Sequence, residues 1–437
     1  ARHPQHFSAC ASSLPPSVRR APAVLIIVNR WTSIVIGACL WALAAPTTLL
    51  AQSAEDEGPP PKFIFGPVGL TPRIALRDVG VDTNPLNQAG ESTRDFTFTL
   101  EPGLDSALRI GRGRLTAKTS VEWLYYNDAS SQRSVNLNQE ARAELVLNRV
   151  RPYVFGAYLR TRQRPTPEID ERVQQNTTNA GVGTRLLVGS RFRFDVEARR
   201  TQYEFGDGDH GDDDIANALN RDSDAGSLIT RFVLTPLTTF IVRSEVQRDR
   251  FEFSPVRDNN SISVVPGFEL KPSALISGLV LVGFRSFDPV DASVPNFAGL
   301  VGRVDAQHIL RESTLFSLQA DRDVVYSIET EQPYYVQNGA RLSMTQVLGL
   351  HWYVVGRIGG VRLAYRDFVT PAAGSDDASS DRIDRVSIRG FGIGRRLGDD
   401  LRIGFDVNYV QRRSTIAASE YEGYRFGGSI SYGLQTR

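Results

Sequence analysis

The stretch from Gly181 to Phe205 reads GVGTRLLVGSRFRFDVEARRTQYEF and has the pattern of two strands joined by a tight turn. In its second half, Phe192, Phe194 and the following apolar residues alternate with charged residues. Successive side chains of a β-strand point to opposite faces, so the apolar and charged sets occupy different faces. Gly189 and Ser190 supply the turn. The stretch therefore predicts a β-hairpin with one apolar face and one charged face.

The same unit recurs from Leu70 onward, and counting the alternating runs gives eighteen strands, with sixteen as the next choice. Short turns alternate with long loops rich in Asp, Ser, Asn, Pro and Gly, such as Arg164–Gln174, Gly206–Arg221 and Thr370–Ser380. Short periplasmic turns and long external loops are typical of outer-membrane barrels. We therefore predict an all-β fold, a transmembrane antiparallel up-and-down β-barrel.

Two soluble all-β folds are the alternatives to a membrane barrel. A solenoid should show a short fixed repeat, and the sequence contains none that we recognise. A sandwich should have longer apolar inner faces and no regular alternation of short and long connections. Closure of the sheet is also required in lipid, because unpaired strand edges cannot lie there.

Composition agrees with a barrel. The chain has 437 residues, of which 41% are hydrophobic, and its mean hydropathy is −0.23. That value argues against a protein with several membrane-spanning helices, whereas the strands of a barrel are only half apolar. Residues 1–51 contain four of the 50 basic residues and no acidic residue, which leaves 46 basic against 49 acidic residues, a net charge near −3. This balance predicts no nucleic-acid partner.

Three segments divide the chain. In residues 1–51, basic residues precede an apolar run, Ile34–Ala45, which is short for a spanning helix and typical of a secretory signal peptide with an upstream leader. We expect cleavage after Ala51. Residues 52–69 are rich in proline and predict an extended periplasmic tether. Residues 70–437 are predicted to form the outer-membrane barrel.

The segment Thr71–Leu86, TPRIALRDVGVDTNPL, resembles the opening of an outer-membrane β-barrel porin family that is associated with exopolysaccharide genes. In both, an alternating strand ends in a turn rich in Asp and Asn, here Asp82 to Asn84. The resemblance implies a porin-like barrel, with polysaccharide or its export proteins as partners, and it transfers no functional residues. The last strand alternates as in such barrels but ends in Gln-Thr-Arg, without their terminal aromatic residue.

Charged residues at alternate positions of the predicted strands are candidates for a pore wall. A charge that faces lipid costs about 2–4 kcal/mol at the membrane midplane, so these side chains should point inward. The predicted pore-lining residues are Lys118, Glu122, Arg142, Glu144, Arg185, Arg193, Asp195, Glu197, Arg243, Glu245, Arg303, Asp305, Asp321, Arg357, Arg389, Arg402 and Asp406. Eighteen strands enclose a lumen too wide for side chains alone to fill, which favours a hydrated pore over a salt-bridged plug.

Other chemistry finds less support. The acidic run Gly206–Asp214, GDGDHGDDD, has hard oxygen ligands but departs from EF-hand spacing, so we expect a solvated external loop and no metal or cofactor. Outside the leader the histidines are His210, His308 and His351, and no Gly-x-Ser-x-Gly motif frames a nucleophile. We therefore predict no enzymatic activity.

These observations predict a channel in the outer membrane of a Gram-negative-type bacterium, surrounded by outer-membrane lipid and inserted by the barrel-assembly machinery. Its expected activity is the passive passage of small polar or saccharide solutes. An outer-membrane partner of exopolysaccharide export or assembly and a structural barrel without transport stay open as alternatives. A loop folded into the lumen would bear on this choice, and Arg164–Gln174 and Gly206–Arg221 are the candidates.

Overall fold

The structure is a computed structural model that describes residues 61–90, 92–206, 215–271, 275–368, 379–398 and 400–433, without the side chains of 379–381. The predicted signal peptide and the first part of the predicted tether lie outside these residues. The strands are β1 (Phe63–Phe65), β2 (Val68–Asp82), β3 (Asp95–Ile110), β4 (Gly113–Tyr126), β5 (Ser134–Leu145), β6 (Val150–Gln163), β7 (Val173–Val188), β8 (Phe192–Phe205), β9 (Arg221–Thr235), β10 (Thr238–Phe251), β11 (Asn259–Leu270), β12 (Ile276–Pro289), β13 (Phe297–Leu310), β14 (Thr314–Tyr326), β15 (Tyr334–Leu348), β16 (Trp352–Arg366), β17 (Ser379–Leu397), β18 (Leu401–Arg413) and β19 (Tyr421–Tyr432).

Within the described residues, helical structure is confined to short pieces between strands: η3 (Ser130–Gln132), α2 (Ile215–Leu219), η4 (Pro255–Arg257) and η5 (Ala417–Ser419). Among the described residues, no helix has the length and apolar character needed to cross a membrane.

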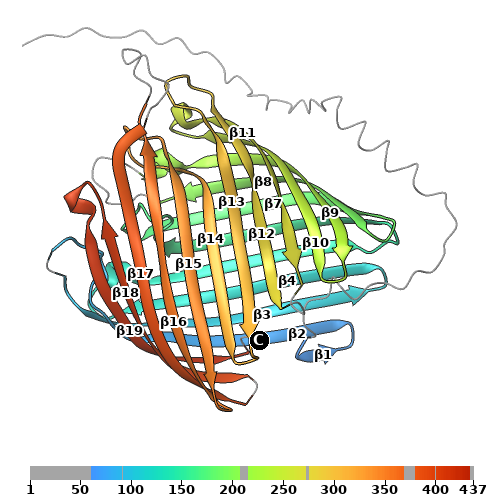
Figure 1. The fold of residues 1–437 in the computed structure, drawn as a ribbon, viewed down its shortest axis with the longest axis horizontal. Coiled ribbons are helices and arrows are strands. Elements are labelled where there is room, and N and C mark those ends of the chain that lie inside the picture. Colours follow the sequence, from blue (N-terminus) through green and yellow to red (C-terminus); the bar gives the residue numbers. More distant parts are fainter. Residues whose placement is uncertain are drawn as a thin grey trace, which may run out of the picture. The chain divides into compact units, whose positions relative to one another are not determined.

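Strands β2 to β19 form one closed ring (Figure 1). Each strand pairs antiparallel with its neighbour in the chain, and β19 pairs back onto β2, for example Phe426 with Val81. The ring contains eighteen strands, which confirms the predicted fold and the preferred strand count. Closure satisfies the backbone hydrogen bonds of every strand without leaving an edge.

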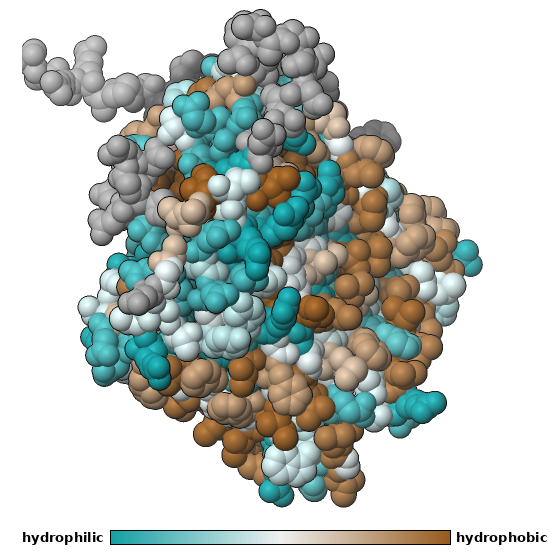
Figure 2. Space-filling view, turned by 60° about the vertical axis from the view of Figure 1, so that its left-hand side comes forward, coloured by the Kyte–Doolittle hydropathy of each residue, from teal (hydrophilic) through white to brown (hydrophobic). Residues whose placement is uncertain are grey.

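The two ends of the barrel differ in their connections. At one end, which we call the short-turn end, two to five residues join successive strands, whereas at the other, the long-loop end, seven to fifteen residues do so. The hairpin quoted first is β7–β8, in which Val188 is directly opposite Phe192 and Val182 is opposite Ala198. Val182 and Phe192 are among many exposed apolar residues of the outer wall, and Figure 2 shows hydrophobic side chains covering much of that surface.

The barrel begins earlier than the sequence predicts. The stretch 52–69, expected to be an extended tether, contains β1, which forms a small hairpin with the start of β2. Gly66 has a φ of +57°, a left-handed conformation that lets the chain reverse there. Lys62 forms an ion pair with Asp400 and lies 4.8 Å from the centre of the Tyr432 ring. Strand pairing thus starts at Phe63. Residues 63–69 belong to this hairpin and not to an extended tether.

Candidate functional site

The inward face of the barrel carries the charged residues of the strands. All the predicted pore-lining residues except Arg389 occupy positions that alternate with the exposed apolar residues of the outer wall. The register brings several of them directly opposite one another, such as Arg185 with Asp195 and Arg303 with Asp321. These residues therefore lie on the inward face, and their role as a pore lining stays a prediction.

Arg389 is the exception, and its predicted inward position is wrong. It lies directly opposite Ile358, which is 59% exposed, and shares its face with Phe391, which is 56% exposed. Glycines occupy the inward positions of this part of β17. The inward face therefore shows no polar pattern in the sequence. Arg389 is eight residues from Leu397 at the short-turn end and lies opposite Tyr409, whose ring centre is 4.7 Å from that of Tyr424. An arginine so far along the strand can extend its guanidinium toward the polar membrane interface.

Ion pairs join inward charges within a strand and between strands one or two places apart in the ring. Asp195 accepts a hydrogen bond from Arg185 (2.8 Å) and also pairs with Arg231. Arg357 and Asp406 approach to 2.8 Å across β17. Further pairs are Arg199 with Glu245 (2.9 Å) and Arg142 with Glu144 (4.0 Å). These contacts fix long side chains along the wall.

Sequence reasoning missed several wall residues on β2 and β3. Arg73 binds Asp105 at 3.0 Å, and Arg77 binds both Glu101 (2.5 Å) and Glu122 (3.2 Å). Arg73 and Arg77 alternate with Ile74 and Leu76, so the period-two pattern alone could have identified them. Pairing them with particular carboxylates required the register between the strands.

The loop between β6 and β7, residues 164–172, folds across the lumen. Its Glu168 accepts hydrogen bonds from the Ser327 hydroxyl (2.6 Å) and the Ile328 amide (3.2 Å), which follow β14. Arg412 of β18 donates to the Glu168 carbonyl oxygen (2.8 Å) and to Asp170 (2.5 Å). Because β6 and β7 stand almost half the ring away from β14 and β18, this loop bridges opposite walls. The sequence had singled out this loop as one of two candidates for the lumen.

The second candidate, Gly206–Arg221, contributes a helix to the same place. Helix α2 packs its Ile215 and Leu219 against Ile169 of the 164–172 loop and against Ile328. These residues form a buried apolar cluster inside the long-loop end. Residues 207–214, which hold the acidic run considered as a cation site, lie outside the described residues.

A third element, the tip of the β14–β15 hairpin, also bends inward. Pairing between β13 and β14 ends at Gly302 and Arg322, while β14 and β15 stay paired up to Tyr326. The Tyr326 ring meets Phe251 of β10 at 4.8 Å, and its hydroxyl donates to Asp249 at 2.7 Å. Three strands separate β10 from β14 along the ring, so the tip leans over the inner faces between them. We call residues 164–172, α2 and the tip 324–336 the plug.

The plug is anchored to β17 and β18 by a buried polar cluster. Arg412 is 1% exposed and donates to Asp384 (2.6 Å), which is itself fully buried. Tyr365 also donates to Asp384 (3.2 Å), and Arg382 pairs with Glu329 of the tip at 2.7 Å. A buried charge is stable only when it is paired and hydrogen-bonded, so removing one member should release the others.

Burial raises the pKa of Glu168, which lies in a loop outside the spanning strands, to about 7. The two hydrogen bonds from Ser327 and Ile328 oppose this shift, as does the positive charge of Arg382, while Glu329 adds to it. Desolvation dominates because the carboxyl group has little access to water. The plug thus contains a carboxyl group that changes its charge near neutral pH.

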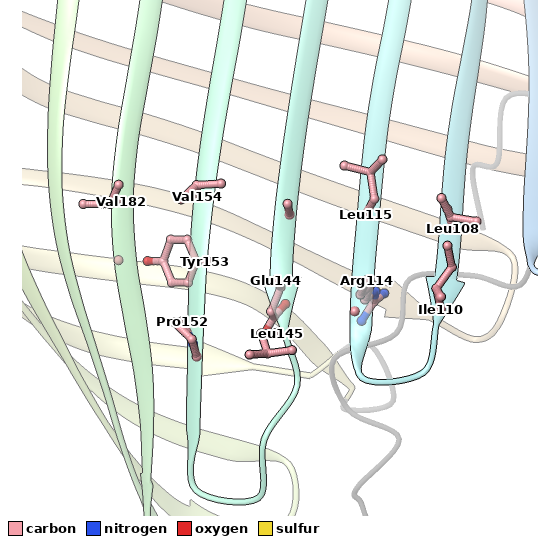
Figure 3. Close-up of a pocket in the computed structure, with 13 residues that line it drawn as sticks. Leu108, Ile110, Arg114, Leu115, Glu144, Leu145, Pro152, Tyr153, Val154 and Val182 are labelled. Carbon is pink, nitrogen blue, oxygen red and sulfur yellow. The ribbon is translucent and has the colours of Figure 1, made fainter. Parts of the chain in front are cut away.

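A groove of about 580 Å³ lies over β3 to β7 near the short-turn end (Figure 3). Leu115, Val154 and Val182 line it, and the register places them in one row on the outer wall. Each of these three side chains is more than 40% exposed, so the groove faces the surroundings of the barrel and is not a solute site in the lumen.

Comparison with solved structures finds large membrane barrels of low sequence identity. The outer membrane protein OpdK from Pseudomonas aeruginosa is 11% identical, with a TM-score of 0.45, covering 83% of this chain and 98% of that one. A bacterial polysaccharide outer membrane secretin is 9% identical, with a TM-score of 0.34, covering 84% and 98%. The FrpB iron transporter from Neisseria meningitidis is 7% identical, with a TM-score of 0.43, covering 79% and 63%.

No curated protein sequence matches the chain. The family described as "Putative beta-barrel porin 2" matches residues 66–431, a span that includes all eighteen strands of the ring except the last residue of β19. The chain belongs to this family of outer-membrane β-barrel porins.

Proposed function

We propose that this protein is an outer-membrane channel for the passive passage of small polar or saccharide solutes, and that the plug controls the width of its lumen. It resides in the outer membrane of a Gram-negative-type bacterium, with the short turns in the periplasm and the long loops outside. No catalytic step is part of the proposal.

The observation that carries the proposal is the solvent access of the charged inner wall between the plug and the short-turn end. The Arg77 side chain is 45% exposed and the Asp105 side chain 37% exposed, although both lie inside the ring. Charged side chains that stay hydrated inside a barrel supply a path on which polar solutes exchange their hydration shell for wall contacts.

The position of the plug supports a channel that admits small solutes and excludes large ones. It joins opposite walls through Glu168 and fills the long-loop end with apolar side chains. A solute must therefore pass beside the plug or displace it. The contacts of the plug with the wall are partly polar and partly apolar. Local opening of such a segment requires less free energy than unfolding of the whole barrel.

Single-channel recording in planar bilayers tests the proposal. One variant replaces residues 165–171 with seven Gly and Ser residues, which preserves the loop length and removes Glu168, Ile169 and Asp170. We expect small conductance from the wild type and a several-fold larger conductance from this variant. The matched control replaces the exposed loop 415–419 in the same way and should conduct like the wild type.

Absence of conductance in both the wild type and the plug variant, with heat-modifiable gel mobility retained, would overturn the channel and favour a structural barrel. The export alternative predicts a different result. In that case a polysaccharide-synthesis or export protein should co-purify with the barrel, and the plug variant should alter surface polysaccharide without changing the uptake of small solutes.

A further inference from the structure

The inward face near the short-turn end is strongly basic. Seven arginines on the inward positions of β3 to β9 lie within four residues of the end of their strand at a short turn, and we call this set the basic mouth. It consists of Arg109, Arg114, Arg142, Arg151, Arg185, Arg193 and Arg231. Arg114 is seen next to the β3–β4 turn in Figure 3, level with Glu144 of β5.

Among the described residues of β3 to β9, two carboxylates lie within the same distance of these turns, Glu144 and Asp195, and Glu269 of the nearby β11 reaches Arg231 at 3.7 Å. Seven arginines and these three carboxylates leave a net charge of +4. Asp195 is already shared by Arg185 and Arg231, and Glu144 is 4.0 Å from Arg142. The carboxylates therefore neutralise only part of the basic mouth.

Several of these arginines face one another across neighbouring strands. Arg109 is directly opposite Arg114, Arg151 is opposite Arg185, and Arg193 is opposite Arg231. Across the lumen, Arg396 of β17 is likewise opposite Arg402 of β18. Like charges directly opposite one another destabilise a sheet. Four such pairs at one end of one lumen indicate a requirement for positive charge that outweighs this cost.

The turns extend the basic mouth. Arg112, Arg149 and Arg191 are the last residues of three successive short turns, at equivalent places in the ladder. Their carbonyl oxygens accept hydrogen bonds from Val146 (2.8 Å), Leu187 (2.8 Å) and Val233 (2.9 Å). Equivalent turns are two strands apart, which spaces these arginines by about 10 Å along the rim.

The charge changes farther from the short turns. Toward the middle of the lumen, arginines and carboxylates pair, as in Arg73 with Asp105 and Arg199 with Glu245. The end near the plug contains buried charges of both signs, such as Asp384 with Arg412 and Arg382. A channel mouth lined by one sign of charge concentrates solutes of the other sign.

We propose that the channel is selective for anions and that its substrates are small organic anions, such as carboxylates and acidic sugars, which the basic mouth attracts and binds. This rests on the proposed channel function and names its substrate class. The guanidinium group suits the task because its planar set of donors binds a carboxylate through two hydrogen bonds and keeps its charge at any physiological pH.

The test is the reversal potential of the channel in a KCl gradient, measured with the wild type and with the plug variant described above. A triple variant, R114Q/R151Q/R193Q, removes three charges from the basic mouth. The matched control, R160Q/R248Q/R362Q, removes three arginines from the outward face of β6, β10 and β16. Heat-modifiable gel mobility shows that each variant forms a barrel.

We expect chloride to be more permeant than potassium in the wild type. The ratio of the two permeabilities should fall by about threefold or more in the mouth variant and stay unchanged in the control. Glutarate added on the short-turn side should reduce the chloride current of the wild type more than that of the mouth variant.

The outcomes separate the two proposals. A channel that conducts but favours potassium, or whose selectivity is equal in the mouth variant and the control, overturns anion selectivity and leaves the channel function intact. Equal block by glutarate in the wild type and the mouth variant would contradict binding at the basic mouth. Failure of both the wild type and the plug variant to conduct overturns the channel itself.

Discussion

The two ends of this barrel are built from the same alternating strands, yet their inward residues have different environments. Near the short turns, inward arginines remain accessible to solvent, and the side chain of Arg142 is 35% exposed. At the long-loop end, inward residues such as Asp384, Arg412 and Tyr365 are buried because the plug covers them. Alternation decides which way a side chain points. Whether an inward side chain contacts water or is buried depends on whether a loop folds back into the lumen.

The largest effect should come from Arg412→Ala. This residue binds the Glu168 carbonyl, Asp170 and Asp384 from a fully buried position, so its loss removes the cation that links the 164–172 loop to Asp384. Removing one partner of a buried pair costs about 3–5 kcal/mol. We expect the plug to detach, measured as faster protease cleavage at residues 164–172 and larger single-channel conductance. Arg413→Ala, an exposed neighbour, is the matched control, and equal cleavage in both would refute the anchoring role of Arg412.

The next effect concerns the pH dependence of the plug. The pKa of Glu168 is about 7 when the plug is seated and near 4.5 when it is released into water. The seated plug therefore favours the protonated carboxyl, and it loses stability as pH rises from about 4.5 to 7. At about 1.4 kcal/mol per pKa unit, the loss is at most about 3 kcal/mol. Channel opening should increase over this range.

The groups that face Glu168 set the controls for this experiment. Arg382 and Arg412 approach it from β17 and β18, Asp384 is near them, and Glu329 lies on the hairpin tip. Glu168→Gln keeps an uncharged side chain of similar shape and should keep the plug seated at every pH from 4.5 to 8. An unchanged pH profile in this variant would assign the titration to another group.

A smaller effect on barrel stability should distinguish an outward arginine of β17 from an inward arginine of its neighbour β16. Arg389 lies among exposed apolar residues of the outer wall, so Arg389→Leu should stabilise the barrel by about 1 kcal/mol or less, because a lipid-facing charge near the interface costs little. The matched change on the inner wall, Arg357→Leu, removes the partner of Asp406 and should destabilise the barrel. The temperature at which the folded gel band is lost measures both. Stabilisation by the second change alone would reverse the assignment of the faces.

The smallest effect belongs to the β1 hairpin. Lys62→Ala removes a partly exposed ion pair with Asp400 and a contact with the Tyr432 ring, together worth about 1 kcal/mol or less. We expect protease access to residues 61–67 to rise while the melting of the barrel is unchanged. Loss of the folded gel band in this variant would show that the hairpin is part of the barrel wall rather than an addition to it.

The sequence by itself determined the strands, their count and the two kinds of connection, because a period of two and a change of composition are local properties that a reader can count. It also determined which charges point inward wherever apolar residues mark the other face, as Val196 and Phe194 do around Asp195. It failed at Arg389, where glycines occupy the neighbouring inward positions and so do not mark that face as polar.

Only the tertiary structure decided which inward charges meet and which are covered. The pairing of Arg412 with Asp384 depends on the register between β17 and β18, and its contact with Glu168 depends on a loop that begins on the far wall. The opposed arginines of the basic mouth depend on register in the same way, since a shift of one residue would turn one of them outward. Side-chain direction follows from local alternation, whereas proximity between segments hundreds of residues apart follows from closure of the barrel.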